Sequence, residues 1–308
     1  MVIIGKDTLL QGTSVQSPRE TSATNANSNF LRASIRVSNL EASIKFYCQQ
    51  FGFRVQKMLD VPGGEAEEQR AILSAGESAS FNLELVENST APAVTPGDWF
   101  VHFTLIVPST TDVIQSLKDS GHGKLIVNEM EAVIPVRSLS PIGGQSTQDI
   151  VALVKDLENY TWQIMEAKRS GVVPEPLCSI TLRTTNLEKT IANCSRLFGL
   201  NVTQKYEASH EPPEYKTALL GFGPELETVQ LEFRQTETPP LVHRGNGIVR
   251  IVVGCSDLAA TETALREAEE AVEKVEIGSI DDPGAKETAV CTVLEPDGLW
   301  QVCFVSNS

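Results

Sequence analysis

Two carboxylates and one imidazole occupy the polar sides of segments whose side chains alternate in the manner of half-buried strands. Glu84, Glu232 and His102 each face away from a row of apolar neighbours. Those rows are Phe81, Leu83 and Leu85 for the first, Val229, Leu231 and Phe233 for the second, and Val101, Phe103 and Leu105 for the third. One such strand is most simply a solvated surface, but three in agreement predict a concave polar face suited to a ligand or an ion.

These segments belong to a motif that the chain contains twice. Residues 31–53, LRASIRVSNLEASIKFYCQQFGF, reappear in similar form as residues 179–200, SITLRTTNLEKTIANCSRLFGL. In each copy an alternating strand leads into an amphipathic helix that begins at a capping box and stops at a glycine. The predicted boxes and stops are Ser38, Glu41 and Gly52 in the first copy, and Thr185, Glu188 and Gly199 in the second. Two copies built alike predict two folded units built alike.

The order of elements predicts four βαβββ modules, two in each half of an α+β protein. After each copy of the motif come three strand-like runs, and then a further strand and helix. The runs are 53–59, 69–75 and 80–86, then 200–206, 215–221 and 228–234; the further strands and helices are 100–107 with 110–121 and 247–254 with 257–274. The predicted organisation is a disordered tail over 1–29, rich in Ser, Thr, Asn and Gln, a first domain over 30–170 and a second over 171–308.

Composition excludes several classes of partner. A net charge of -15 and a pI of about 4.8 would repel phosphate backbones, so nucleic acid is not expected as a partner. The apolar runs are too short to span a membrane. The six cysteines form no C-x-x-C pair, which favours a reducing compartment and core packing over disulfides. We expect a cytoplasmic protein. An organellar stroma or matrix stays open, although the tail is poor in the arginines of a transit peptide.

In five segments the chain resembles the vicinal oxygen chelate superfamily, and within it the glyoxalase I (lactoylglutathione lyase) family in its two-domain, plant-type form. The resemblance extends over about residues 30–306. It rests on the order of the five segments and on the nearly constant offset in sequence between the repeated ones. The segments are IRVSNLEASIKFYCQQFGF, PLCSITLRTTNLEKTI, PEYKTALLGFGPELETVQLE, GNGIVRIVVG and LEPDGLWQVCFV.

The resemblance implies tandem domains whose modules pair into two curved half-barrel sheets with the helices outside. It also implies an isomerase that converts the hemithioacetal of glutathione and methylglyoxal to S-lactoylglutathione, with glutathione as co-substrate. In such enzymes a divalent ion, Ni²⁺ or Zn²⁺, is held by four side chains, two from a module of each domain, and two of the four are carboxylates. Because the family's dimer is fused here into one chain, a monomer is expected.

The family's ligand positions, carried onto this chain, give two unequal sets. Pairing the first and fourth modules gives Arg32, Glu84, Arg250 and Val302, which is not a metal site. Pairing the second and third gives His102, Gln163, Ser179 and Glu232, which keeps one imidazole and one carboxylate. The resemblance thus implies a metal in the second set only, with Glu232 as the catalytic proton carrier. A structural histidine is the alternative for His102.

Three further positions match those that bind glutathione in the family, namely Arg36, Asn88 and Arg183. The two arginines are otherwise simple surface charges. The degenerate ligand sets lead to the hypothesis of a glyoxalase I-like protein with reduced or lost isomerase activity, acting on a small-molecule thiol adduct. The alternative is a non-catalytic protein of the same fold that binds a partner protein or a small anion, the latter attracted by Arg32 and Arg250 beside Glu84.

Overall fold

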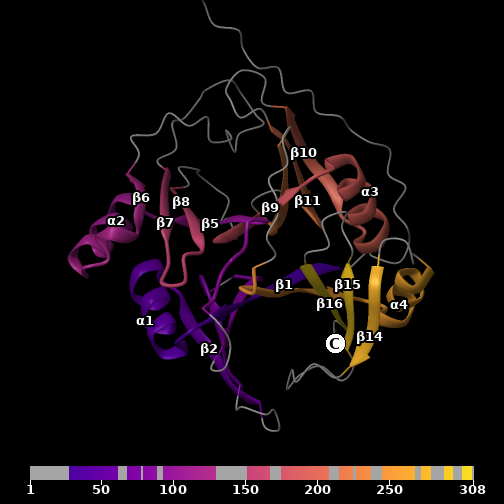
Figure 1. Ribbon diagram of the computed structural model, residues 1–308, viewed down its shortest axis with the longest axis horizontal. Coiled ribbons are helices and arrows are strands. Elements are labelled where there is room, and N and C mark those ends of the chain that lie inside the picture. The colour runs from indigo at the N-terminus through magenta and orange to yellow at the C-terminus, as the bar shows by residue number, and fades with distance from the viewer. Residues whose placement is uncertain are drawn as a thin grey trace, which may run out of the picture.

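Among the residues that it describes, the computed structural model shows two mixed β-sheets and four α-helices, an α+β architecture (Figure 1). It describes residues 28–61, 68–77, 79–88, 93–129, 151–166, 175–207, 215–224, 227–236, 245–267, 272–278, 288–293 and 300–306. The predicted tail lies outside the described residues except for its last two, of which Asn29 begins the first strand. None of the described helices is long and apolar enough to cross a membrane.

Sheet A has eight strands and joins the first and fourth modules. Its order is β14 (Val272–Gly278), β15 (Thr288–Val293), β16 (Trp300–Ser306), β13 (Ile248–Cys255), β1 (Asn29–Val37), β4 (Asn82–Glu87), β3 (Glu68–Ser74) and β2 (Arg54–Val61). The central pair, β1 and β13, is antiparallel, whereas β1 runs parallel to β4 and β13 parallel to β16. The sheet is open at β14 and β2.

Sheet B repeats this plan with the third and second modules. Its order is β10 (Asn201–Glu207), β11 (Tyr215–Gly221), β12 (Gln230–Thr236), β9 (Leu177–Thr184), β5 (Phe100–Val107), β8 (Thr161–Glu166), β7 (Val151–Lys155) and β6 (Ile126–Glu129). Its central pair, β5 and β9, is again antiparallel. Each sheet therefore takes one module from each half of the chain, which is the pairing that the two ligand sets assumed.

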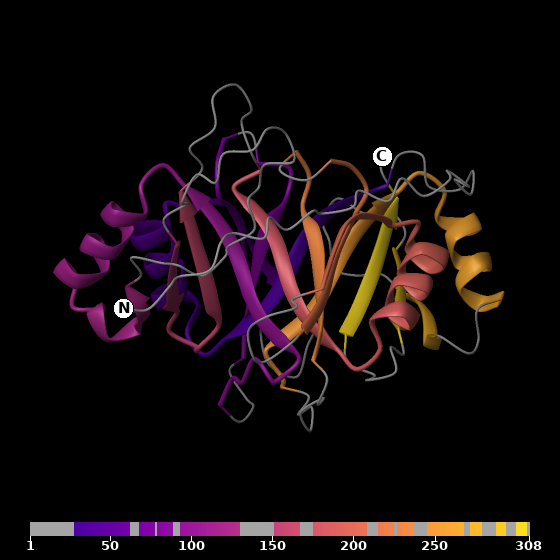
Figure 2. The ribbon, with the colours of Figure 1, turned by 90° about the horizontal axis from the view of Figure 1, so that it is seen from above.

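The helices lie at the two sides of the sheets. On one side α1 (Leu40–Phe51) contacts α2 (Thr110–Asp119), which is followed by a short 3-10 turn, η2 (Gly123–Leu125); on the other α3 (Leu187–Phe198) contacts α4 (Leu258–Glu267) (Figures 1 and 2). The apolar faces of both sheets and the inner faces of the helices form one continuous hydrophobic core. With one face of each sheet in this core, the polar residues of the strands are left on the opposite, concave face.

The helix stops agree with the sequence patterns, but the N-caps do not. Gly52 and Gly199 end α1 and α3 with positive φ angles of 74° and 69°, a conformation that costs glycine nothing. The capping side chains are Asn39 and Asn186, which accept hydrogen bonds from the backbone of the third helical residue, and not Ser38 and Thr185. Asparagine is as strong a cap as serine, so the box pattern pointed one residue too early.

The second-half helix predicted over 257–274 is too long. Helix α4 ends at Glu267 in the described residues, and Val272–Gly278 forms strand β14, paired antiparallel with β15. The run of Glu, Ala and Lys in this segment has the period of a helix, but the alternating Val and Ile residues that follow fit a strand. Pairing with β15 therefore ended the helix earlier than local propensity indicated.

Candidate functional site

On the concave face of sheet B a buried hydroxyl bridges an imidazole and a carboxylate. Thr181, from β9, donates through Oγ1 to Oε2 of Glu232 on β12 at 2.8 Å. Nε2 of His102, from β5, lies 3.0 Å from the same Oγ1. Because a hydroxyl has a single proton and Thr181 gives it to Glu232, Nε2 of His102 must be the donor in this network. The strand register, in which Thr181 pairs with both His102 and Glu232, brings the three together.

The other two predicted ligands lie on the same face but are not drawn into this network. Ser179 pairs with Thr104 in register, and Thr104 pairs with Gln163 of β8. Oγ1 of Thr104 lies 3.5 Å from Oε1 of Gln163, which is a long contact for a hydrogen bond. The tertiary structure thus places His102, Gln163, Ser179 and Glu232 on one surface.

The donors of this surface do not fit a four-ligand cage for Zn²⁺ or Ni²⁺. Within the described residues no three side chains of His, Cys, Asp or Glu gather at one point. Oε2 of Glu232 accepts from Thr181, and Oε1 is paired with Nε of Arg234 at 3.0 Å. A divalent ion here would meet one carboxylate, already neutralised by a guanidinium group, and one imidazole that donates to a hydroxyl. Neither Thr181 nor Arg234 was proposed as a site residue from the sequence, although alternation puts Arg234 on the face of Glu232 and Thr181 on the face of Ser179.

On the concave face of sheet A three arginines surround one carboxylate. Nε of Arg32 lies 3.3 Å from Oε2 of Glu84, Nη1 of Arg70 3.6 Å from Oε1, and Nη2 of Arg250 3.4 Å from both oxygens. The hydroxyl of Ser34 also donates to Glu84. Burial raises the pKa of the Glu84 carboxyl, but the guanidinium groups, Arg250 foremost, and Ser34 outweigh it and hold that pKa below its ordinary value of 4.5. We call Arg32, Arg70 and Arg250 the arginine cluster.

The residues on this surface differ from those expected from the sequence. Val302, expected at the fourth ligand position, points into the core, because its partner in register, Ile251, lies on the core face of β13. Cys303 pairs with Val252 and takes the concave face instead, one residue further along β16. Arg70 was not singled out from the sequence. It lies on the same face of β3 as Ile72, which is the residue in register with Glu84. Neither the predicted ligand set of sheet A nor the side chains that the structure places there would bind a divalent cation.

The predicted glutathione positions are divided between the sheets. Arg36 lies near the end of β1, and Asn88 follows β4 and donates its backbone N–H to the carbonyl of Val37 at 2.9 Å. Arg183 lies on β9 of sheet B, where its side chain is exposed. Arg36 and Asn88 therefore lie on neighbouring strands of sheet A or directly after them, whereas Arg183 lies in sheet B with His102 and Glu232.

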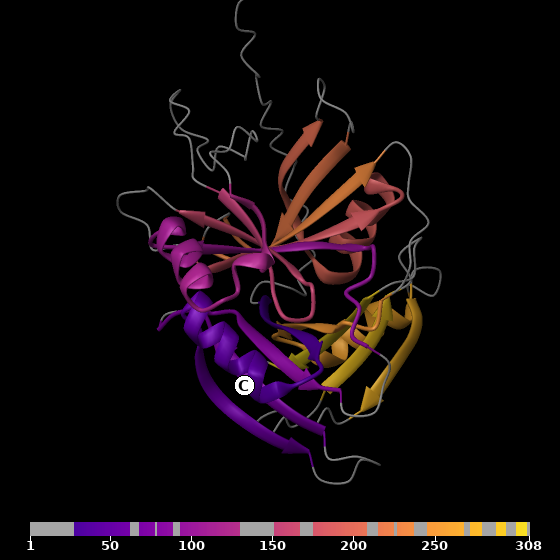
Figure 3. The ribbon, with the colours of Figure 1, turned by 60° about the vertical axis from the view of Figure 1, so that its left-hand side comes forward.

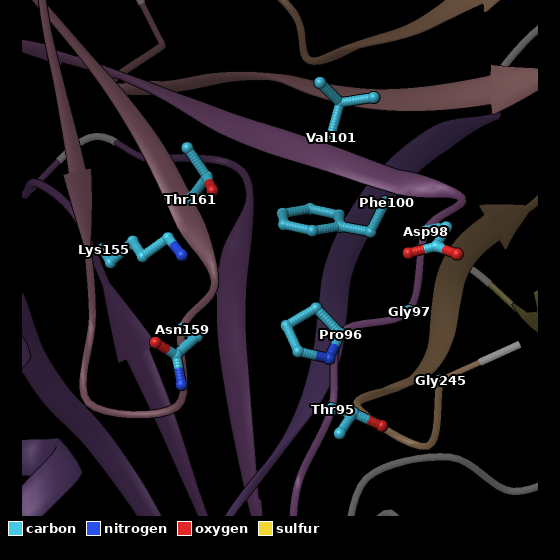
Figure 4. Close-up of a pocket in the computed structure, with 10 residues that line it drawn as sticks. All are labelled: Thr95, Pro96, Gly97, Asp98, Phe100, Val101, Lys155, Asn159, Thr161 and Gly245. Atoms are coloured by element: carbon cyan, nitrogen blue, oxygen red, sulfur yellow. The ribbon is translucent and has the colours of Figure 1, made fainter. Parts of the chain in front are cut away.

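A pocket of about 410 Å³ lies beside the β7–β8 hairpin, and no predicted ligand is among the residues that line it (Figure 4). Lys155, Asn159 and Thr161 of the hairpin line one side. Pro96, in the segment that leads into β5, and Phe100, the first residue of that strand, are among those that line the other. Thr161 and Gln163 share a face of β8, so the pocket lies two residues along the strand from a predicted ligand.

Comparisons with known proteins agree with this architecture. Residues 29–164 match the model of the Glyoxalase/Bleomycin resistance protein/Dioxygenase superfamily. The chain is 27% identical over 283 residues to a putative lactoylglutathione lyase of Brassica oleracea var. gemmifera, covering 90% of this chain and 91% of that protein. It is 28% identical over 275 residues to a probable chloroplastic lactoylglutathione lyase of Arabidopsis thaliana, covering 88% and 71%. The crystal structure of glyoxalase I from Zea mays shares the fold, with a TM-score of 0.73 at 24% identity over 91% of this chain and 93% of that one.

Proposed function

Since residues 29–164 belong to the glyoxalase superfamily and the chain is homologous to plant lactoylglutathione lyases over most of its length, we propose that it is a glyoxalase I relative whose metal-dependent isomerase activity is strongly reduced or lost. The hydroxyl bridge between His102 and Glu232 carries this proposal. Both oxygens of Glu232 already have donors, Thr181 and Arg234, so the carboxylate cannot reach a substrate carbon without breaking two hydrogen bonds.

The state of sheet A supports the same proposal. Its equivalent surface offers three guanidinium groups around Glu84 and a thiol at Cys303, and guanidinium groups repel a divalent ion. A protein can keep a fold while its site changes, because core residues specify the fold and a few polar residues specify the chemistry. The concave faces are retained here, and their ligand sets are not.

Metal content and turnover test the proposal directly. The purified chain is incubated with Ni²⁺ or Zn²⁺, passed through a desalting column, and assayed for bound metal and for S-lactoylglutathione formed from glutathione and methylglyoxal. We expect less than stoichiometric metal and turnover close to the uncatalysed rate. A kcat within about tenfold of that of an ordinary glyoxalase I would overturn the proposal.

A gain-of-ligand variant sharpens this test. Gln163→Glu adds a second carboxylate to the face of His102 and Glu232, so it should raise the affinity for Ni²⁺ above that of the wild type. Thr161→Glu adds the same charge two residues away on the same face of β8 and serves as the control. If Thr161→Glu raises Ni²⁺ affinity as much as Gln163→Glu, the effect is one of general charge and the assigned ligand positions are wrong.

Residual catalysis in sheet B is the second candidate function. His102 and Glu232 flank a single hydroxyl, and Gln163 and Ser179 share their surface, so these four would be the ligands of a Ni²⁺ or Zn²⁺ ion. For this function Thr181 and Arg234 would have to release Glu232, which would then carry the proton. Glu232→Gln should abolish any turnover that the wild type shows, whereas Glu188→Gln, an exposed carboxylate on α3, should preserve it. Equal turnover in both variants would exclude catalysis by Glu232.

For the substrate we propose a small thiol adduct of the glutathione type, held in part by Arg183 in sheet B and by Arg36 and Asn88 in sheet A. Arg183→Ala should weaken binding of S-lactoylglutathione measured by calorimetry, whereas Arg196→Ala, an exposed residue of α3, should not. Equal binding in the two variants would remove Arg183 from the site.

We also propose that the protein is a monomer, which sedimentation equilibrium tests. We propose that it resides in the cytoplasm or in an organelle, as the name of the chloroplastic relative says of that protein.

A further inference from the structure

The pocket beside the β7–β8 hairpin has two walls of different chemistry. Its volume of about 410 Å³ is that of a cavity that holds a small molecule. The hairpin wall presents polar side chains, and the opposite wall presents mainly apolar ones. They are Lys155, Asn159 and Thr161 on the first wall, and Pro96, Phe100 and Val101 on the second. In Figure 4 Lys155 extends from the hairpin toward the ring of Phe100, which points back toward the hairpin.

The polar groups of the hairpin wall are available to a ligand. Within the described part of the chain, no hydrogen bond or ion pair involves the ammonium group of Lys155, the side-chain amide of Asn159 or the hydroxyl of Thr161. Asp98 is the carboxylate among the residues that line the pocket, and it interacts with a residue other than Lys155. The half-buried Lys155 therefore brings a positive charge to the pocket that no described carboxylate pairs with.

The turn of the hairpin holds these side chains in place. Oδ1 of Asp156 accepts two backbone N–H groups of the turn, both at 2.9 Å, and its carbonyl accepts the N–H of Asn159 at 3.2 Å. Asn159 has a φ of 67°, which asparagine tolerates better than most residues. Lys155 and Thr161 are partners in register, so their Cβ atoms lie about 5 Å apart and one small group can contact both side chains.

The opposite wall is fixed where the two halves of the chain meet. The backbone N–H of Thr95 donates to Oδ1 of Asn246 at 2.8 Å, and the N–H of Gly247 donates to the carbonyl of Thr95 at 2.9 Å. Gly245, which also lines the pocket, lies so close that a Cβ there would be 2.2 Å from that carbonyl oxygen. Both walls are thus ordered before any ligand arrives, which lowers the entropic cost of binding.

We propose that this pocket binds a small organic carboxylate, whose charged group lies at Lys155 and Thr161 and whose apolar part lies against Phe100 and Pro96. One unpaired ammonium group beside a hydroxyl and an amide suits a single negative charge. A dianion such as phosphate would bring a second charge with no second cation on this wall, in a protein whose net charge is -15. The proposal does not depend on the presence or loss of isomerase activity.

Calorimetric titration of the full-length chain with three small probes tests the proposal. Benzoate has a carboxylate and a flat apolar ring, benzamide has the ring without the charge, and acetate has the charge without the ring. We expect saturable binding of benzoate with a dissociation constant on the order of 1 mM, and at least about tenfold weaker binding of the other two. Absence of saturable benzoate binding, or equal affinity for either of the other probes, would overturn the proposal.

Variants of the hairpin wall locate the carboxylate. Lys155→Gln should weaken benzoate binding by about tenfold or more, because it removes a charged donor. Lys57→Gln, which removes an exposed lysine on β2 of sheet A, should leave the affinity unchanged. Thr161→Val removes the hydroxyl at nearly constant shape and should weaken binding about fivefold, which provides a second test if Lys155→Gln does not fold. Wild-type affinity in the folded pocket variants would overturn the proposal.

Two cross-measurements separate this pocket from the thiol-adduct site proposed for sheet B. Arg183 is not among the residues that line the pocket, so Arg183→Ala should leave benzoate affinity unchanged. Lys155→Gln should likewise leave the affinity for S-lactoylglutathione unchanged. If Arg183→Ala weakens benzoate as much as Lys155→Gln does, or if Lys155→Gln weakens S-lactoylglutathione about tenfold, the two sites are one and the proposal of a separate carboxylate pocket is overturned.

Discussion

The strongest prediction about stability concerns Tyr47, which reaches from α1 to a buried carboxylate in the β7–β8 turn. Its hydroxyl donates to Oδ2 of Asp156 at 2.5 Å, and Nε1 of Trp162 donates to the same oxygen at 3.0 Å. The other oxygen, Oδ1, accepts from the backbone N–H groups of Glu158 and Tyr160, both at 2.9 Å. This carboxylate joins α1, the indigo helix in Figure 3, to sheet B.

Tyr47→Phe removes the hydroxyl with almost no change of shape. A hydrogen bond to a charged group contributes about 1.5 to 3 kcal/mol, and Asp156 keeps its other three donors, so we expect a loss near the lower end of that range. Burial raises the pKa of Asp156 to about 6 in spite of these hydrogen bonds, of which the one from Tyr47 is the strongest opposing influence. Removing it should move the pKa of Asp156 higher still.

The sign of the pH dependence follows from this shift. An acid whose pKa is raised on folding binds a proton more tightly in the folded state, so its contribution to stability declines as pH rises from about 3.8 to about 6. Tyr47→Phe extends that window upward because the ionised form loses its donor. The variant should therefore lose more stability at pH 8 than at pH 5, as measured by equilibrium urea unfolding at both values.

Tyr160→Phe is the matched control. The Tyr160 hydroxyl donates to the uncharged backbone carbonyl of Arg36 at 3.1 Å, so its loss should cost about 0.5 to 1.5 kcal/mol at both pH values. An equal cost of Tyr47→Phe at pH 5 and pH 8 would show that the hydroxyl does not stabilise the ionised carboxylate, and the reasoning would be refuted.

Three other perturbations have outcomes that the structure determines. A Cβ at Gly245 would lie 2.2 Å from the carbonyl oxygen of Thr95, so Gly245→Ala should lower the melting temperature far more than Gly123→Ala, whose Cβ would meet no atom closer than 3.8 Å. Asn186→Ala should cost about 1 kcal/mol in urea unfolding, because α3 loses its N-cap, and no change would contradict the cap. Because folding lowers the pKa of Glu84, its carboxylate stabilises the fold above about pH 4.5, and this contribution is lost as the pH falls through the pKa of the folded state. Glu84→Gln should remove this loss of stability in acid. An unchanged loss of stability in acid would contradict the prediction.

Local patterns in the sequence were sufficient for the plan of the fold. Alternation of apolar residues placed the strands, and the glycines at 52 and 199 ended α1 and α3 because a left-handed residue is needed there. The repeated motif identified modules built alike, and the resemblance of five segments identified the family. Alternation likewise put Glu84, Glu232 and His102 on concave faces. Such properties depend on residues a few positions away in the sequence, so they can be predicted without knowing which strands pair.

The composition of each site was decided by pairing between distant strands. Thr181 lies between His102 and Glu232 because β9 is paired with β5 on one side and with β12 on the other. Arg70 joins Glu84 through the register of β3 with β4. The parallel register of β13 with β16 turns Cys303, and not Val302, to the concave face; a shift of one residue reverses the face of every side chain in a strand. The end of α4 was decided in the same way, because β15 offered backbone partners to residues whose local pattern also suited a helix.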